Sequence, residues 1–426
     1  MNIEMRVDLA FGKNGLPLEL PSGFDYQMLE ARSAQPLPDA VAALEHALDY
    51  PIDSLGLTEM AQGKRTAAIS VCDITRPAPN RLTLPLVLKR LEAGGIPRSG
   101  IRICIATGLH RIATEAELDE ILSPEIARAY EIVNHNAKTL SDHVYLGDTA
   151  AGTPVLIDRR FIEADLHITL GFIEPHLMLG FSGGRKLIAP GLAGQETIKV
   201  IHSPKFMRDP RAVEGSVADN PLHQELLAVA RMARHDFLLD VALTRDRKVA
   251  QVFAGHPEKA HARGMAFVAE VMLEQLPEPV DAVITTCAGY PLDLTFYQAI
   301  KGITAASHIV KPGGRILVCA ACDEGPGAPE FTKMLREHPS DREFLAKIKS
   351  GPVTVDQWQL EKLALVTTRF DAYFYIPGVP AKYYPSLWGK AFPTLPEAVV
   401  AFLNGLPPGA KIAVIPEGPY VLARAA

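Results

Sequence analysis

The sequence has no apolar run long enough to cross a membrane. A spanning helix needs roughly 18 or more consecutive apolar residues, and no stretch of this 426-residue chain approaches that length. The N-terminal stretch MNIEMRVDLAFGKNG carries charges throughout, so it lacks the uncharged apolar segment of a secretory signal. We therefore expect no membrane partner and a cytoplasmic location.

An excess of basic charge is also missing. The 43 Lys and Arg residues are outnumbered by 49 Asp and Glu residues, which gives a formal net charge of -6. Nucleic-acid binding depends on a basic surface that neutralises phosphates. We therefore expect no nucleic-acid partner.

Cysteine is scarce, and its pattern gives little sign of function. The five cysteines are an odd number, which does not suit an extracellular disulfide framework. Cys319 and Cys322 form a C-x-x-C pair at the end of an apolar run, RILVCA. Side chains alternate along a strand, so this spacing separates the two thiols if the strand continues. Small core residues are the favoured interpretation over a redox pair.

A phosphate-binding P-loop is absent, although one segment is similar to it. Residues 180–191 read GFSGGRKLIAPG, with two glycines directly before Arg185 and Lys186. The P-loop pattern G-x-x-x-x-G-K-[ST] is not met, because Arg185 separates the glycines from the lysine and Leu187 follows it. The role of Lys186 is therefore not that of an ATP-binding lysine.

Short Val- and Ile-rich runs alternate with helical segments along the whole chain. Expected strands are 66–72, 102–107, 166–172, 237–243, 281–286, 315–320, 363–368 and 411–416. Such alternation is typical of βαβ units and parallel sheets. The Pro-rich segment LEQLPEPVDA (273–282) predicts a boundary between an N-terminal α/β domain, 1–270, and a C-terminal α/β domain, 271–426.

Several expected strands run directly into polar clusters. The clusters are DITRP after 66–72, GLHR after 102–107, IEPH after 166–172 and CAGYPLD after 281–286. Ligands of open parallel sheets bind outside the carboxyl ends of the strands. We therefore expect one active site built from these strand ends, in a cleft between the two domains.

Two histidines occupy equivalent places in these clusters. His110 and His176 each follow a strand-end turn. Each alone is more often a turn or capping residue than a functional one. Two imidazoles at one pocket suit a reaction that needs proton transfer on two faces of a substrate.

Other strand-end residues suit anion binding. Arg76 can bind a carboxylate or phosphate bidentately, and Asp73 and Thr75 add an acceptor and a hydroxyl. A local turn before Pro77 is the plainer interpretation of that segment. In YPLDLTFYQAIKG, one helical turn brings together Tyr297, Gln298 and Lys301, a group that is either an ordinary exposed face or an anion-binding one.

Taken together, these motifs resemble the nickel-dependent lactate racemases, which carry a pincer nucleotide cofactor. The resemblance covers most of the chain and rests chiefly on the block GFIEPHLMLGFSGGRKLIAPGLAGQETIKVIH. It also includes DITRP, GLHR, ADNPLHQE and YPLDLTFYQAIKG.

The resemblance implies a role for Lys186. In that family the corresponding lysine anchors a pyridinium mononucleotide with two sulfur-containing arms, the nickel-pincer nucleotide, through a thioamide bond. The nickel is held by the two sulfurs, a ring carbon and one histidine, which corresponds to His202 here. The segment Asp73, Ile74, Thr75 and Arg76 would hold the nucleotide, and Gly183 and Gly184 would let the backbone approach the ring.

The resemblance also implies the reaction, a racemisation or epimerisation of a small 2-hydroxy acid such as lactate. His110 and His176 would exchange the hydroxyl proton of the two enantiomers, while hydride passes to the cofactor and a planar 2-keto acid forms. Arg76, Tyr297, Gln298 and Lys301 would bind the substrate. Separate cofactor-biosynthesis proteins would supply the nickel nucleotide.

Two alternatives remain at this point. His110, His176 and His202 could form a three-histidine zinc site of a hydrolase, although no H-E-x-x-H spacing is present. The chain could also bind the nickel cofactor without catalysing a reaction.

Overall fold

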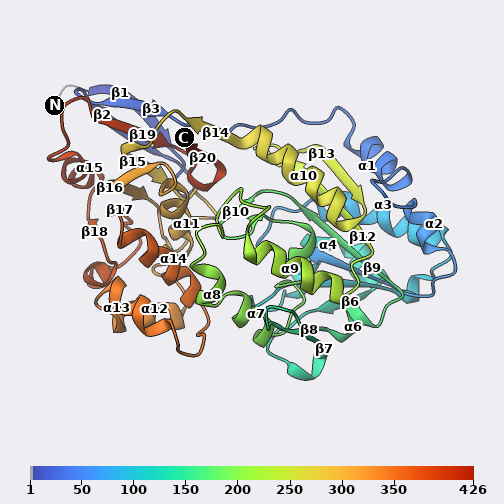
Figure 1. Cartoon of the computed structure of the whole chain (residues 1–426). Coiled ribbons are helices and arrows are strands. Elements are labelled where there is room, and N and C mark those ends of the chain that lie inside the picture. Colours follow the sequence, from blue (N-terminus) through green and yellow to red (C-terminus); the bar gives the residue numbers. More distant parts are fainter. Residues whose placement is uncertain (1–2) are drawn as a thin grey trace. The chain divides into compact units, whose positions relative to one another are not determined.

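The computed structural model describes residues 3–426, which fall into two compact units (Figure 1). The N-terminal unit comprises Ser33–His202 and Asp209–Val271. The C-terminal unit comprises the described residues up to Arg32, then Ser203–Arg208 and Met272–Ala426. No helix among the described residues is long and apolar enough to cross a membrane.

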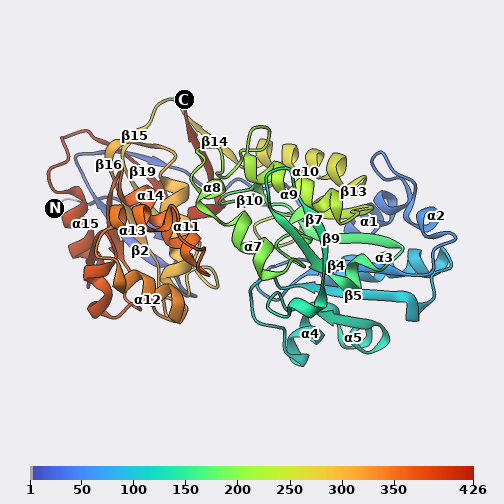
Figure 2. The ribbon, with the colours of Figure 1, turned by 60° about the horizontal axis from the view of Figure 1, so that its bottom comes forward.

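A six-stranded sheet forms the centre of the N-terminal unit. Its order is β13-β12-β9-β4-β5-β6, and every neighbouring pair is parallel except β12 and β13. Figure 2 shows β9, β4 and β5 side by side in this sheet. The strands are β4 (Ala67–Cys72), β5 (Ile101–Ala106), β6 (Glu131–Asn134), β9 (Leu166–Phe172), β12 (Phe237–Leu243) and β13 (Val249–Gly255). β4 and β9 are buried along their whole length, which explains why they read as continuous apolar runs.

Helices and two small hairpins complete this unit. The helices are α1 (Ala40–Asp49), α2 (Leu57–Ala61), α3 (Asn80–Ala93), α4 (Glu115–Leu122), α5 (Pro124–Ala129), α6 (Arg159–Ile162), α7 (Gln195–Ile201), α9 (Pro221–Met232) and α10 (Pro257–Met272). The hairpin strands are β7 (His143–Asp148) with β8 (Pro154–Asp158), and β10 (Pro175–His176) with β11 (Gly180–Phe181).

A second six-stranded sheet, wholly parallel, forms the centre of the C-terminal unit. Its order is β18-β17-β16-β15-β19-β3. The strands are β3 (Asp25–Met28), β15 (Val280–Thr286), β16 (Val310–Cys319), β17 (Asp371–Tyr375), β18 (Lys390–Phe392) and β19 (Lys411–Ile415). The remaining strands of the unit are β1 (Ile3–Leu9), β2 (Leu16–Pro21), β14 (Leu273–Leu276) and β20 (Leu422–Ala425).

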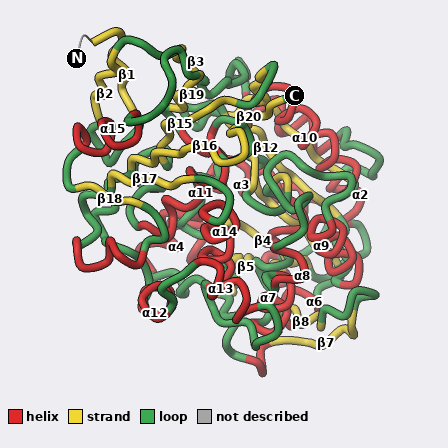
Figure 3. The backbone as a smooth tube through the Cα atoms, turned by 60° about the vertical axis from the view of Figure 1, so that its left-hand side comes forward, coloured by secondary structure: helices red, strands yellow, loops and turns green. Residues whose placement is uncertain are grey.

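Apolar side chains cover both faces of this second sheet. Figure 3 shows α15 on one side of β16 and β17, and α11 and α14 on the other. The helices are α8 (Pro204–Met207), α11 (Phe296–Ala306), α12 (Pro329–Glu337), α13 (Asp341–Ile348), α14 (Gln357–Thr367) and α15 (Leu395–Leu403). The sheet is therefore an α/β layer structure, as the alternation of strands and helices predicts.

The units divide the chain differently from the expected domains 1–270 and 271–426. The division near residue 271 agrees, but β1–β3 and Ser203–Arg208 group with the C-terminal unit. The physical reasons are local. β3 extends the second sheet by pairing with β19, and Arg208 Nε donates to the buried carboxylate of Glu361 at 2.6 Å. These contacts join residues far apart in sequence, and composition does not reveal them.

Two other expectations have clear outcomes. The expected strand 363–368 is wrong, because this run lies in α14 and the next strand of the sheet is β17. An apolar run of this length fits a buried helix as well as a strand. The expectation that Cys319 and Cys322 are core residues is confirmed, since both are buried free thiols. Burial raises the pKa of Cys319 to about 12.

Candidate active site

The carboxyl ends of three neighbouring strands carry three of the polar clusters. β4 lies between β9 and β5, and Cys72 at its end is paired with Ala106 at the end of β5. Asp73, His110 and His176 follow β4, β5 and β9 respectively. The fold thus brings these clusters to one edge of the N-terminal sheet. The fourth cluster follows β15 in the C-terminal unit.

Asp73 and His110 form a hydrogen-bonded pair at this edge. His110 Nδ1 lies 2.7 Å from Asp73 Oδ2, and Thr75 Oγ1 donates to Asp73 Oδ1 at 2.7 Å. Burial alone would raise the pKa of Asp73, but the hydrogen bonds from His110 and Thr75 and the charge of Arg76 hold it below its ordinary value. The carboxylate is therefore an acceptor, so Nδ1 of His110 carries the proton and Nε2 carries the lone pair.

His110 is accessible although its partner is buried. The imidazole is 51% exposed, whereas the Asp73 side chain is 6% exposed. A buried carboxylate that orients an accessible imidazole is an arrangement suited to proton transfer. Both Asp73 oxygens engage neighbouring side chains, an arrangement that the sequence motif DITRP did not reveal. Ile74 and Arg76 are partly buried in the same segment.

His176 lies on the short hairpin of β10 and β11, where it is paired with Gly180. Two hydrogen bonds close the base of this hairpin, from Ser182 N to Glu174 O at 2.9 Å and from Glu174 N to Ser182 Oγ at 3.0 Å. The His176 ring is partly buried, and its Nδ1 accepts a long contact from Met178 N at 3.4 Å. The second expected acid/base histidine is thus held on a closed loop after β9.

Lys186 lies in a tight 3-10 turn, Gly184–Leu187, that follows the hairpin. Gly183 and Gly184 have positive φ angles of 81° and 47°, which favour glycine. A Cβ on Gly183 would lie 2.5 Å from Asp240 Oδ2, and one on Gly184 would lie 3.1 Å from the His261 ring. The glycines are therefore required by close packing against Asp240 and His261, which is a different reason from the expected approach to a cofactor ring.

A buried carboxylate supports this turn from β12. Asp240 is 0% exposed and its Oδ2 accepts from Gly184 N at 2.8 Å. Burial raises the pKa of Asp240 to about 7, although the hydrogen bond from Gly184 and the charge of Arg185 act in the opposite direction. The turn that carries Lys186 is thus held by a titratable group inside the sheet.

His202 ends α7, and its hydrogen bond fixes which nitrogen can bind a metal. Nδ1 lies 2.8 Å from the carbonyl oxygen of Ile198. A carbonyl only accepts, so Nδ1 donates and Nε2 carries the lone pair. Burial, together with the charge of nearby Lys186, lowers the pKa of His202 to about 4, although the hydrogen bond to Ile198 acts in the opposite direction. A neutral imidazole held in one orientation beside Lys186 fits the role of a single metal ligand.

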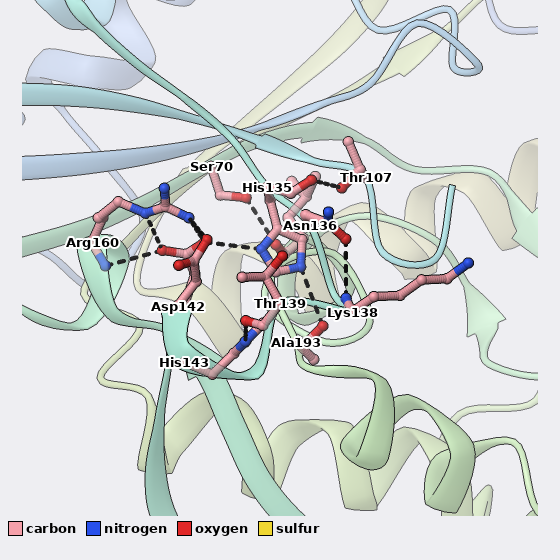
Figure 4. Close-up of polar contacts among 12 residues, drawn as sticks. Ser70, Thr107, His135, Asn136, Lys138, Thr139, Asp142, His143, Arg160 and Ala193 are labelled. Atoms are coloured by element: carbon pink, nitrogen blue, oxygen red, sulfur yellow. Dashed lines mark hydrogen bonds and ion pairs between the residues drawn. The ribbon is translucent and has the colours of Figure 1, made fainter. Parts of the chain in front are cut away.

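A buried histidine network supports the loop after Lys186 (Figure 4). The ring of His135, just after β6, contacts Asp158 Oδ2 at 2.9 Å and Ala193 O at 3.2 Å. The His135 carbonyl accepts from Thr107 Oγ1 at 2.7 Å, and Thr107 O accepts from His110 N at 3.0 Å. The network therefore links the His110 turn to the loop that follows Lys186.

Tyr297, Gln298 and Lys301 form a separate group in the C-terminal unit, at the start of α11. Thr295 caps this helix by accepting from Gln298 N. Tyr297 is held by α14, since its carbonyl accepts from Gln359 Nε2 at 2.8 Å. Within residues 3–426, Gln298 Oε1 is buried without a hydrogen-bond partner.

The histidines do not form a preassembled zinc site. Residues 3–426 contain no group of three or more His, Cys, Asp or Glu side chains arranged to hold a metal ion. The three-histidine arrangement of His110, His176 and His202 is therefore not present. A site with a single protein ligand, as expected for His202, does not need such a group of side chains.

Sequence reasoning missed the residues behind the site. Asp240, Arg185, His261 and His135 are buried and engage the loops that carry the expected site residues. One signal was present, because Asp240 is a charged residue inside the apolar run FLLDVAL. A buried charge at such a position needs a partner. The identity of that partner depends on tertiary contacts alone.

Comparisons with known proteins agree over nearly the whole chain. The lactate racemase N-terminal domain family matches residues 11–215, and the lactate racemase C-terminal domain family matches residues 276–423. A lactate racemase of Thermoanaerobacterium thermosaccharolyticum is 32% identical over 98% of this chain and 99% of its own. A lactate racemase of Lactiplantibacillus plantarum is 36% identical over 89% and 90% respectively.

Solved structures show the same fold. The lactate racemase apoprotein from T. thermosaccharolyticum matches with a TM-score of 0.91 at 32% identity, over 99% of this chain and all of the other. A Thermotoga maritima protein matches at 17% identity with a TM-score of 0.67, over 92% of this chain and all of the other, a likeness of fold alone. The chain therefore belongs to the lactate racemase family and is a racemase, an isomerase.

Proposed function

We propose that this protein racemises lactate or a closely similar small 2-hydroxy acid, with His110 and His176 as the acid/base residues and Lys186 as the anchor of a nickel-pincer nucleotide. The observation that carries the proposal is the Asp73–His110 pair, at the sheet edge that also holds the hairpin of His176. The two named relatives are lactate racemases, which supports lactate as the first substrate to test.

His110 is the better defined of the two bases. Its Nε2 carries the lone pair and can accept a proton from the hydroxyl of a bound 2-hydroxy acid. The resulting imidazolium keeps its Nδ1–H bond to Asp73, whose negative charge stabilises it. His176 would do the same for the opposite enantiomer, because the hydroxyl group lies on the other side of C2. Two bases on separate loops suit a reaction that must run in both directions.

The residues also fit the expected cofactor. Lys186 would form the thioamide bond, and His202 would bind nickel through Nε2, whose lone pair is set by the Nδ1 bond to Ile198. When bound there, the nickel-pincer nucleotide would supply hydride-transfer chemistry at C2 of the substrate. The chain's own contribution is to orient the substrate and to move the hydroxyl proton.

Cationic and polar side chains would bind the substrate. Arg76 is suited to a bidentate contact with the substrate carboxylate, and Lys301, Gln298 and Tyr297 would add a charge and polar contacts. The first turn of α11 supports this role, because it carries Gln298, whose Oε1 is a buried acceptor with no partner within residues 3–426. Ile74 and Thr75 remain proposed contacts of the nucleotide, whereas we assign Asp73 to His110.

The direct test is racemisation by the cofactor-loaded protein. Pure L-lactate and pure D-lactate should each yield the racemic mixture in a chiral assay, and malate and phenyllactate should serve as comparison substrates. Loaded protein that binds nickel but leaves every enantiomer unchanged would indicate a silent cofactor-binding protein. Hydrolytic activity with zinc would support the hydrolase alternative. The cytoplasmic location and the supply of cofactor by biosynthesis proteins stay predictions from the sequence.

A further inference from the structure

The hairpin that carries His176 needs support from outside itself. β10 and β11 contribute only two residues each, which is too little pairing for independent stability. Its tip, Leu177–Leu179, is buried. A Cβ on Gly180 would lie 2.1 Å from Ser216 O, so the hairpin is packed tightly against the following segment. Asn220 Nδ2 adds one tie by donating to Met178 O at 2.9 Å.

Arg185 provides a second tie, from the residue next to Lys186. Its side chain is 1% exposed, and Nη2 donates to the carbonyl oxygens of Leu179 at 3.0 Å and Phe181 at 3.2 Å. Nη1 lies 3.4 Å from both nitrogens of the His261 ring, which itself contacts Ser182 O at 2.7 Å. One guanidinium therefore joins the tip and the second strand of the His176 hairpin to the Lys186 turn.

Burial of the charged Arg185 guanidinium carries a desolvation cost in free energy. Burial lowers the pKa of Arg185 to about 9 even though the charge of Asp240 acts in the opposite direction. The guanidinium is still charged at neutral pH, so a cation is buried mainly against carbonyl groups. An apolar side chain would fill the same space without that desolvation cost. Only arginine offers several N–H donors in a fixed planar array, so its benefit is in geometry.

We propose that Arg185 is a positioning residue that sets the placement of the His176 hairpin relative to the Lys186 turn. This inference rests on the proposed function, in which His176 exchanges the substrate proton and Lys186 anchors the cofactor. Loss of the Arg185 side chain is expected to misplace the His176 imidazole while the Asp73–His110 pair, which follows β4 and β5, is unchanged.

The first test uses the apoprotein and needs no activity. Hydrogen–deuterium exchange should become at least about tenfold faster in the segment 174–182 of Arg185→Met, because two carbonyls lose their donor. Exchange around Asp73 and His110 should not change. Arg231→Met is the matched control, since the Arg231 side chain is 60% exposed and forms an ion pair with Glu258. Unchanged exchange in Arg185→Met would overturn the proposal.

The second test uses the loaded enzyme and each pure enantiomer. In single-turnover bleaching of the cofactor absorbance, Arg185→Met should slow one enantiomer at least about tenfold more than the other, and it should be the enantiomer that His176→Ala slows more. Arg185→Lys should show a smaller asymmetry than Arg185→Met, because an ammonium can donate to one of the two carbonyls. Equal slowing of both enantiomers would indicate general damage and contradict the proposal.

The outcomes separate this inference from the function on which it rests. If the wild-type protein carries no adduct on Lys186, the proposed function fails. If the wild type is loaded and active but Arg185→Met shows no asymmetry, only the positioning role fails. If neither Arg185→Met nor Arg185→Lys folds, Arg185 serves the whole unit and not this placement, which also overturns the proposal.

Discussion

His110 Nδ1 lies 2.7 Å from Asp73 Oδ2, and the two residues follow neighbouring parallel strands. The pair exists because β4 and β5 end in register, with Cys72 opposite Ala106. The hydrogen bonds from its donors hold Asp73 ionised, so it fixes the ring tautomer of His110. In the proposed reaction, Asp73 would also stabilise the positive charge that His110 acquires as a base.

Asp73→Asn should therefore impair the chemical step. We expect kcat to fall about a hundredfold, within the usual range for general acid–base contributions, with little change in KM and with the Lys186 adduct retained. Intact-mass measurement and steady-state kinetics check both parts. Thr75→Val, which removes only the donor to Oδ1, should cost much less. Loss of the adduct in Asp73→Asn would instead support the nucleotide-binding role that the sequence motif predicts.

Single substitutions at His110 and His176 should act on opposite enantiomers. Each change to Ala should cost about a hundredfold or more in rate. Net turnover in both directions falls together, because a racemase must obey the overall equilibrium. Transient hydride transfer is where the asymmetry should appear, measured as bleaching of the cofactor with each pure enantiomer. Two variants that slow both enantiomers equally, or not at all, would rule out the two-base assignment.

His202→Ala should separate nickel binding from anchoring. The variant lacks the ring whose Nε2 lone pair is set by Ile198, so it should lose nickel while the organic group stays on Lys186. Metal analysis and intact mass on the same preparation measure the two quantities. Lys186→Ala should lose the adduct altogether. Full nickel content in His202→Ala would show that another residue is the ligand.

Asp240 should make stability depend on pH. Its folded-state pKa of about 7 lies above the ordinary value of about 4 for an unfolded Asp, so the folded state favours the protonated carboxyl. Stability is then greatest below about pH 4 and decreases as the pH rises to about 7. Asp240→Asn keeps an acceptor for Gly184 N but cannot ionise.

The measurement is the melting temperature of both proteins at pH 5 and pH 8. From the lower to the higher pH, wild type should lose at least about 2 °C more than Asp240→Asn, the shift that about 1 kcal/mol produces in a chain unit of this size. Other titrating groups are common to both proteins and cancel in the difference. Parallel curves would mean that Asp240 is ionised over this pH range in the folded state as well as in the unfolded state.

The sequence predicted the repeating βαβ pattern and the strand-end positions of His110 and His176, because both follow from local periodicity. It could not predict that β3 joins the C-terminal sheet, since that pairing joins Asp25 to Lys411. It also could not show that Gly183 faces Asp240. The motif DITRP placed Asp73 at the correct strand end, but its pairing with His110 depends on the order of strands in the sheet.

The central claim is that Lys186 is the covalent anchor of the cofactor in a working racemase. The most direct measurement is peptide mapping by mass spectrometry on a preparation whose interconversion of L- and D-lactate has just been quantified. We expect an added mass on the peptide that contains Lys186, in proportion to the activity. The corresponding peptide of Lys186→Ala should carry no added mass, and that variant should be inactive. Fully active enzyme with an unmodified Lys186 would contradict it.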